Sequence, residues 1–124
     1  MSRSHRETVE HWFDAARGFD YLVELNAFVV EDDITERPTL AVRLVLSRSE
    51  TAGGAPCLVV VCTDVGELHV ESLCPGSPIG PLFVDDLRAR GWDGPALKLS
   101  DREQDDKLRL TCAELTWELR ETGR

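Results

Sequence analysis

The chain has 124 residues, 42% of them hydrophobic, and a formal net charge of −9. This length suffices for one domain with its own core, and we predict a single domain over residues 1–124, with a helix in residues 4–18 and a β domain in residues 20–120. The negative field argues against nucleic acid or an anionic membrane as a partner and favours a basic protein. Because no segment has the about 20 apolar residues that span a bilayer and the N-terminus lacks a signal-peptide core, we expect a cytoplasmic protein.

The first predicted element is the helix in residues 4–18. Ser4 and Glu7 have the spacing of a capping box, and Gly18 suits the left-handed conformation that ends many helices. The apolar residues recur at helical spacing and form one stripe: Val9, Trp12, Phe13 and Ala16. The narrow stripe predicts a helix that lies on the surface of a sheet. As an alternative, Trp12 and Phe13 anchor the helix to a partner.

Two strands separated by an acidic loop follow the helix. Residues 21–31 are rich in β-branched and aromatic side chains, which favours a strand with a bulge or short break at Asn26. Residues 39–47 alternate with a period of two, which also predicts a strand. The acidic residues between them predict a solvated loop: Glu31, Asp32, Asp33 and Glu36. The Gly-rich residues 48–56 predict a hairpin connection.

Residues 57–73 form the most regular stretch, and we predict a central β-hairpin there. An apolar run opens at Cys57 and closes at Cys62, as in a strand covered on both faces. Residues 67–71 alternate, which predicts a half-exposed strand. Residues 63–66 supply the turn, because Gly66 accepts positive φ and Asp64 can hydrogen-bond to its own backbone.

The second half of the chain contains shorter elements. Residues 74–81 hold three prolines and two glycines, a composition that excludes a helix or a central strand. Short strands are predicted in residues 80–87 and 97–99, with a tight turn at residues 92–95. The polar residues 100–106 connect them to the last strand.

The last element, residues 107–119, changes the parity of its apolar residues. Leu108, Leu110 and Cys112 share one face, but the next apolar set is Leu115, Trp117 and Leu119. Either a β-bulge near Ala113 restores the same inward face, or the second half of the strand passes to a different core. We favour the bulge, since one small domain is expected to have one core.

These elements predict a mainly β fold: an antiparallel β-sandwich or strongly bent sheet of six or seven strands with one N-terminal α-helix. The hairpin and the last strand supply the most regular apolar faces. We therefore expect these residues to be buried together: Val59, Val61, Leu68, Val70, Leu108, Leu110 and Trp117.

No motif for catalysis, cofactor binding or metal binding is found. The spacing of Asp101, Glu103 and Asp105 resembles the start of an EF-hand, but the required Gly and Glu are replaced by Asp106 and Cys112. Asp85 and Asp86 are adjacent on a predicted strand, so their side chains point to opposite faces. Cys74 is the only cysteine predicted at a turn, and a nucleophile there would need His69 or another histidine nearby. We expect four reduced thiols, no metal, no cofactor and no enzymatic activity.

The order of the strands resembles small bacterial all-β families found among polymorphic-toxin immunity proteins and related domains. The matching positions lie in DVGELHVESL and KLRLTCAELTWEL: Val65, Leu68 and Val70, then Leu108, Leu110, Cys112, Leu115 and Trp117. The resemblance covers residues 20–120, consists mostly of core positions and implies an all-β fold without catalytic residues. The N-terminal helix has no counterpart in these families.

The expected function is therefore that of a non-enzymatic protein-binding module, with an immunity protein that neutralises a basic toxin as its most specific form. The alternative is a structural or regulatory interaction domain, of which a homodimer through an edge strand is one form. For binding we expect the two acidic segments to be used: Glu31, Asp32, Asp33 and Glu36 in the first, and Asp101, Glu103, Asp105 and Asp106 in the second. Like charges packed so closely would be relieved by a basic partner.

Overall fold

The computed structural model describes residues 5–32, 37–48, 56–71, 77–79, 82–87, 91, 96–101 and 107–120. Its elements are, in chain order, α1 (His5–Ala16), β1 (Tyr21–Asp32), β2 (Arg37–Ser47), β3 (Cys57–Thr63), β4 (Glu67–Val70), β5 (Ser77–Pro78), β6 (Phe83–Asp86), β7 (Leu97–Ser100), β8 (Leu108–Cys112) and β9 (Glu114–Arg120).

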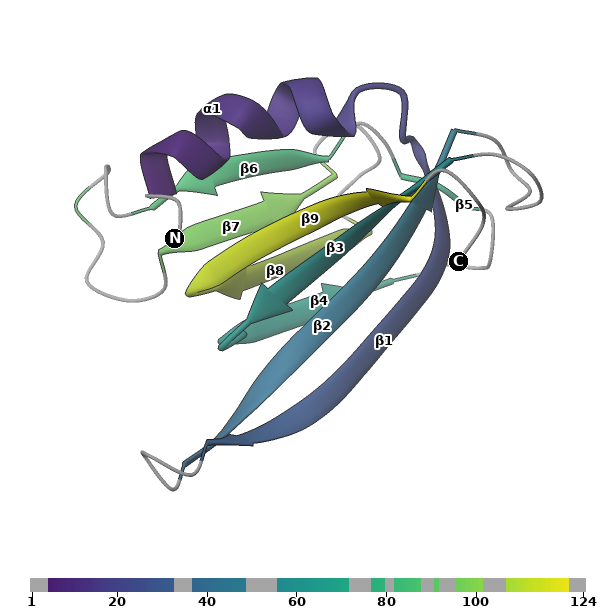
Figure 1. Cartoon of the computed structure of the whole chain (residues 1–124). Helices are drawn as coiled ribbons and strands as arrows, with labels where there is room; N and C mark the ends of the chain where they lie inside the picture. Colours follow the sequence, from purple (N-terminus) through teal and green to yellow (C-terminus); the bar gives the residue numbers. More distant parts are fainter. Residues whose placement is uncertain are drawn as a thin grey trace.

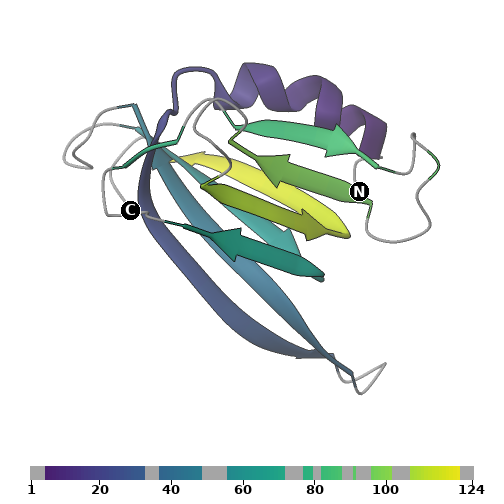
Figure 2. The same ribbon diagram turned by 180° about the vertical axis from the view of Figure 1, so that it is seen from behind.

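The strands form two antiparallel sheets that pack on each other, with α1 along one side (Figures 1 and 2). Sheet A has five strands in the order β5-β1-β2-β3-β9, and sheet B has four in the order β4-β8-β7-β6. The prediction of a mainly β fold with one N-terminal helix is confirmed. The described residues contain more strands than the six or seven expected, because the predicted last strand is divided into β8 and β9 and a further short edge strand, β5, lies in residues 74–81.

The predicted central hairpin in residues 57–73 is wrong, because its two strands do not pair with each other. β3 pairs with β2 and β9 in sheet A, whereas β4 pairs with β8 in sheet B. The residues between them make a corner that carries the chain across the core. Asp64 adopts the left-handed conformation there, with φ of 52°, a conformation that Asp tolerates better than most residues. The expected turn in residues 63–66 is present, but it connects strands of two different sheets rather than two strands of one hairpin.

The parity change in the last element has the same cause. β8 belongs to sheet B and β9 to sheet A, with Ala113 between them. When a strand crosses from one sheet to the facing one, the core lies on its opposite side, so the inward residues change parity while the core stays the same. The favoured β-bulge is therefore wrong, and the alternative of a second core is wrong as well. Leu110 and Leu115 reach one core from two sheets.

The two corners lie side by side and bond to each other. The amide of Gly66 donates to the carbonyl of Thr111 at 3.0 Å, and the amide of Ala113 donates to the carbonyl of Thr63 at 3.1 Å. A Cβ on Gly66 would lie 3.3 Å from the hydroxyl of Thr111, which is why a residue without a side chain fits this position.

Helix α1 closes the side of the sandwich between β6 and β9 (Figure 1). Trp12 is fully buried, its indole N–H donates to the carbonyl of Leu82 at 2.8 Å, and its ring meets Trp117 edge-to-face at 5.6 Å. Trp12 is therefore a core residue and cannot anchor a partner. Phe13 remains half-exposed against Phe83. The left-handed Gly18 is confirmed, with φ of 82°, whereas Ser4 lies outside the described residues.

The main core joins residues of both sheets and the helix. Leu108 and Leu110 are fully buried in it, and Leu68 and Trp117 pack against it, as expected. The expectation was wrong for three valines. Val59 lies in a small second cluster with Val45 and Cys57, because residues of β3 with odd numbers point away from the main core. Val61 is partly exposed for the same reason, and Val70 is exposed at the end of β4.

We predict that Leu110→Ala lowers the free energy of unfolding by about 2–5 kcal/mol, because it leaves a cavity where the two sheets meet. Val70→Ala is the matched control, and its cost should stay within about 0.5 kcal/mol because Val70 is largely exposed. Urea titration measures both variants. A loss below about 1 kcal/mol for Leu110→Ala would contradict the position of the core.

Candidate functional site

The hairpin of β1 and β2 extends beyond the sandwich as an arm, which we define as residues 26–32 and 37–40 (Figures 1 and 2). The strands of sheet B are too short to cover it. Residues 26–31 of β1 are all exposed, so both faces of the strand meet solvent. Such exposure is unusual for a segment whose apolar sequence is typical of a buried core strand.

The outer edge of β1 in the arm has no neighbouring strand among the described residues. On this edge only Tyr21 and Leu22 are paired, with Pro78 and Ser77 of β5. From Glu24 onward, the pairing described for β1 is with β2, on the other side of the strand. A strand edge of this kind presents a row of backbone N–H and C=O groups to which another strand can bond.

The middle of β1 in the arm, residues 27–30, is apolar. Phe28, Val29 and Val30 are 39%, 66% and 41% exposed. The pairing with β2 places Phe28 beside Ala41 and Val30 beside Thr39 on one face, and Val29 beside Leu40 on the other. Exposed edges in proteins usually carry charges, prolines or bulges that prevent pairing. Residues 25–30 carry none of these, so the arm is the most exposed apolar strand edge in the described part of the chain.

Three features hold the arm in place. β1 and β2 pair without a break from Glu24 to Asp32. Arg43 and Glu24 form an ion pair across the two strands. The amide of Val65, in the corner after β3, donates to the carbonyl of Leu40 at 2.8 Å and ties the base of the arm to the sandwich. The irregularity expected at Asn26 lies instead between Leu22 and Glu24, which leaves the arm itself regular.

Apart from Glu31 and Asp32, the sequence did not single out the arm residues as a site. Residues 21–31 were interpreted as a strand by their β-branched and aromatic content, and such a run is expected inside a sheet. The available signal is that the apolar residues 27–30 fall on both faces of the strand and end at Glu31 and Asp32. A strand that is apolar on both faces must be covered on both faces or meet a partner.

The structure separates the two predicted acidic segments. Glu31 is exposed and Asp32 ends β1, so both lie at the far end of the arm, whereas Asp101 follows β7 at the opposite end of the molecule (Figures 1 and 2). They do not form one surface. The other predicted residues lie outside the described ones: Asp33, Glu36, Glu103, Asp105 and Asp106.

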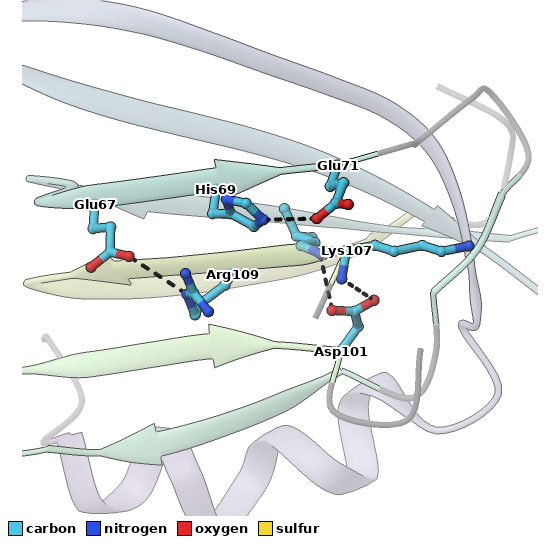
Figure 3. A network of polar contacts seen from close by, with 7 residues as sticks. Glu67, His69, Glu71, Asp101, Lys107 and Arg109 are labelled. Atoms are coloured by element: carbon cyan, nitrogen blue, oxygen red, sulfur yellow. Dashed lines mark hydrogen bonds and ion pairs between the residues drawn. The ribbon is translucent and has the colours of Figure 1, made fainter. Parts of the chain in front are cut away.

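Asp101 is buried and bonds to the backbone of its own hairpin. Its carboxylate accepts from the amides of Lys107 at 3.1 Å and Leu108 at 2.9 Å, and its own amide donates to the carbonyl of Leu108 at 3.2 Å (Figure 3). A buried carboxylate is tolerated when donors satisfy it in this way. Asp101 therefore holds the start of β8 next to the end of β7 and presents no exposed charge to a partner.

The outer face of sheet B carries a second group of polar side chains (Figure 3). Arg109 of β8 lies 3.5 Å from Glu67 of β4, and His69 lies 3.4 Å from Glu71. These side chains are partly or largely exposed, and exposed pairs of this kind contribute little to stability. These polar groups pair locally with one another, which gives this face the character of a solvated surface.

The cysteines that the structure describes are buried, as expected: Cys57, Cys62 and Cys112. A hydrogen bond with Cys112, together with burial, raises the pKa of the Cys62 thiol well above its ordinary value. Since the thiolate is the nucleophile, this disfavours reactivity at Cys62. Cys74 lies outside the described residues.

Comparisons with family models, with curated proteins and with solved structures found no match to this chain. Among the residues described, no three His, Cys, Asp or Glu side chains lie where they could hold a metal ion together. None of the described helices is both long and apolar enough to cross a membrane.

We predict that Asp101→Ala lowers the free energy of unfolding by about 1–3 kcal/mol, because the buried amide of Leu108 and its neighbour lose their acceptor. Asp101→Asn keeps one acceptor oxygen and should cost less. Glu31→Ala is the control for the loss of an acidic residue, and it should be nearly neutral because Glu31 is exposed. Equal stabilities for the two alanine variants in urea titration would contradict the role given to Asp101.

We predict that a thiol reagent detects four free thiols in the denatured protein. In the folded protein the three buried cysteines should not react at mildly alkaline pH, because burial blocks access and the raised pKa keeps Cys62 protonated. A count of two or zero after denaturation would show disulfides instead. Rapid reaction of more than one thiol in the folded state would contradict the burial.

Proposed function

We propose that this chain is a non-enzymatic protein-binding domain that takes up an extended segment of its partner along the free edge of β1. The observation that carries the proposal is the exposed apolar arm, in which Phe28, Val29 and Val30 lie beside an unpaired strand edge in the described part of sheet A. An exposed, long and apolar edge is unfavourable in a free protein unless something covers it.

Such an edge binds through strand addition. The backbone groups of the partner segment supply affinity, and its alternate side chains supply specificity on the two faces of the extended sheet. Here one face offers Phe28 and Val30, and the other offers Ala27 and Val29. A partner segment with apolar side chains on both faces would fit this arrangement.

The charge of the chain supports a basic partner. The net charge is −9, and Glu31 and Asp32 stand at the end of the strand edge. Opposite charge on a partner would accelerate the encounter, and the same field opposes nucleic acids and anionic membranes. An immunity protein that neutralises a basic toxin in the cytoplasm is the most specific form of this proposal, supported by the resemblance of residues 20–120 to immunity families.

We predict that the full chain, immobilised and exposed to a lysate of its native host, retains a basic protein, and that Val29→Lys abolishes this retention. A lysine on the edge opposes strand addition by its charge and repels a basic partner. Val70→Lys is the matched control, since it places the same charge on an exposed valine of another edge strand, β4. This variant should bind like the wild type.

Salt supplies the second measurement. Binding to a basic partner should weaken as salt rises, because the Debye length shrinks from about 10 Å at 0.1 M to about 3 Å at 1 M. If Val29→Lys retains the same protein as the wild type at the same level, the arm is not the binding surface. A toxin-like reading frame beside the gene, with its product as the retained protein, would support the immunity form.

A further inference from the structure

We propose that, in the absence of a partner, the arm pairs with the arm of a second copy of this chain. The two β1 strands run antiparallel about a two-fold axis at Val29, and sheet A of one copy continues directly into sheet A of the other. The proposal rests on the proposed function, because it names what covers the same edge in the free protein. It makes self-association and partner binding mutually exclusive.

Symmetry restricts the possible registers. Residues that lie opposite each other on neighbouring strands point to the same face of the sheet, as Phe28 and Ala41 do in the pairing of β1 with β2. Consecutive residues of one strand point to opposite faces. A two-fold axis placed midway between two residue positions would set consecutive residues opposite each other and violate this rule. The axis must therefore lie at one residue position, so that this residue faces its own copy in the second chain.

The register centred on Ala27 is excluded, because β5 already pairs with part of the β1 edge. That axis would set Asp32 of the second copy opposite Leu22, where β5 already pairs with β1. The bulge between Leu22 and Glu24 also interrupts the edge there. Registers centred before residue 27 overlap β5 still further.

Charge and apolar contact separate the remaining registers. An axis at Phe28 sets Asp32 opposite Glu24, and like charges directly opposite are destabilising. An axis at Val30 sets Asp32 opposite Phe28 and Glu31 opposite Val29, so only Val30 faces an apolar partner. The axis at Val29 sets Asp32 opposite Asn26, so no acidic residue of β1 faces another across the axis.

The register at Val29 also matches the three exposed apolar residues with one another. Phe28 lies opposite Val30 of the second copy, this contact occurs twice by symmetry, and Val29 lies opposite itself. Aromatic side chains opposite β-branched ones are among the favourable cross-strand pairs. The residues with exposed fractions of 39%, 66% and 41% in one chain are then covered by the same residues of the other.

The net charge gives this dimer a characteristic response to salt. Two chains of charge −9 repel each other, and added salt screens this repulsion. The dimer should therefore tighten as salt rises, whereas the complex with a basic partner should weaken. The opposite salt dependences therefore distinguish self-association from partner binding at the same strand edge.

The first test is sedimentation velocity of the full chain over a range of concentrations, at about 0.05 M and about 0.5 M NaCl. We expect a reversible monomer–dimer equilibrium that shifts toward dimer at the higher salt. Val29→Lys should be monomeric under all conditions, and Val70→Lys should follow the wild type; thermal melts confirm that both variants are folded. A monomeric wild type at every concentration and both salts, or a dimer unaffected by Val29→Lys, overturns the proposal.

The second test fixes the register by cross-linking in a Cys74→Ser background, which leaves only the three buried native cysteines. Residues opposite each other in antiparallel strands have Cα atoms about 4.5–5.5 Å apart, within the range of a disulfide. Val29→Cys should form a disulfide-linked dimer on mild oxidation. Phe28→Cys is the matched control, because residue 28 faces Val30 rather than itself, and it should form no disulfide-linked dimer. Cross-linking of Phe28→Cys with none of Val29→Cys overturns the register.

The two proposals fail separately. A monomeric wild type that still binds a partner through the arm removes the dimer and leaves the proposed function. A dimer sensitive to Val29→Lys, with no partner retained, supports the dimer and removes partner binding along this edge.

Discussion

The fold depends on a pair of corners at which two neighbouring strands leave one sheet for the other together. β3 continues into β4 next to the place where β8 continues into β9, and the two bends exchange hydrogen bonds through Gly66 and Thr111, and through Ala113 and Thr63. A strand that crossed alone would leave backbone groups unpaired at the bend, which is costly when they are shielded from water. Because the strands cross as a pair, each satisfies the other, and one core can be covered from both sides.

The corners also produce the arm. They divide two long stretches of chain into short strands, so that β4 has four residues and β8 five, while β1 has 12 and β2 has 11. At about 3.3 Å per residue, β1 spans about 40 Å, but the strands opposite it span only about 13–17 Å. Sheet B therefore covers the part of the hairpin near the corners and leaves the remainder exposed on both faces. The candidate binding surface is a consequence of this difference in strand length.

The sequence predicted the class of fold, the N-terminal helix and most strands, because these depend on local periodicity. It failed where the answer depends on distant residues. A corner between sheets and a hairpin turn have the same local signature, a polar, Gly-containing segment between two strand patterns, so residues 63–66 could not reveal that β3 and β4 belong to different sheets. Exposure of Phe28 and Val29 likewise depends on the length of the strands facing them. Nor does a run of acidic residues show that Asp101, unlike Glu31, folds back onto backbone amides.

An apolar strand edge carries a risk, because strands can add to it without limit and form aggregates. At the other edge of sheet A, α1 lies beside β9 and Trp12 contacts Trp117. A strand that pairs with β1 occupies the apolar edge and leaves none of the same kind among the described strands, so association closes at two chains, as in most symmetric oligomers.

The net charge of −9 also opposes unlimited association. It repels copies that approach in other orientations, while pairing along β1 combines backbone hydrogen bonds with burial of Phe28 and Val30. Repulsion over the whole surface and attraction along one edge together favour a single strand-to-strand contact over unspecific aggregation.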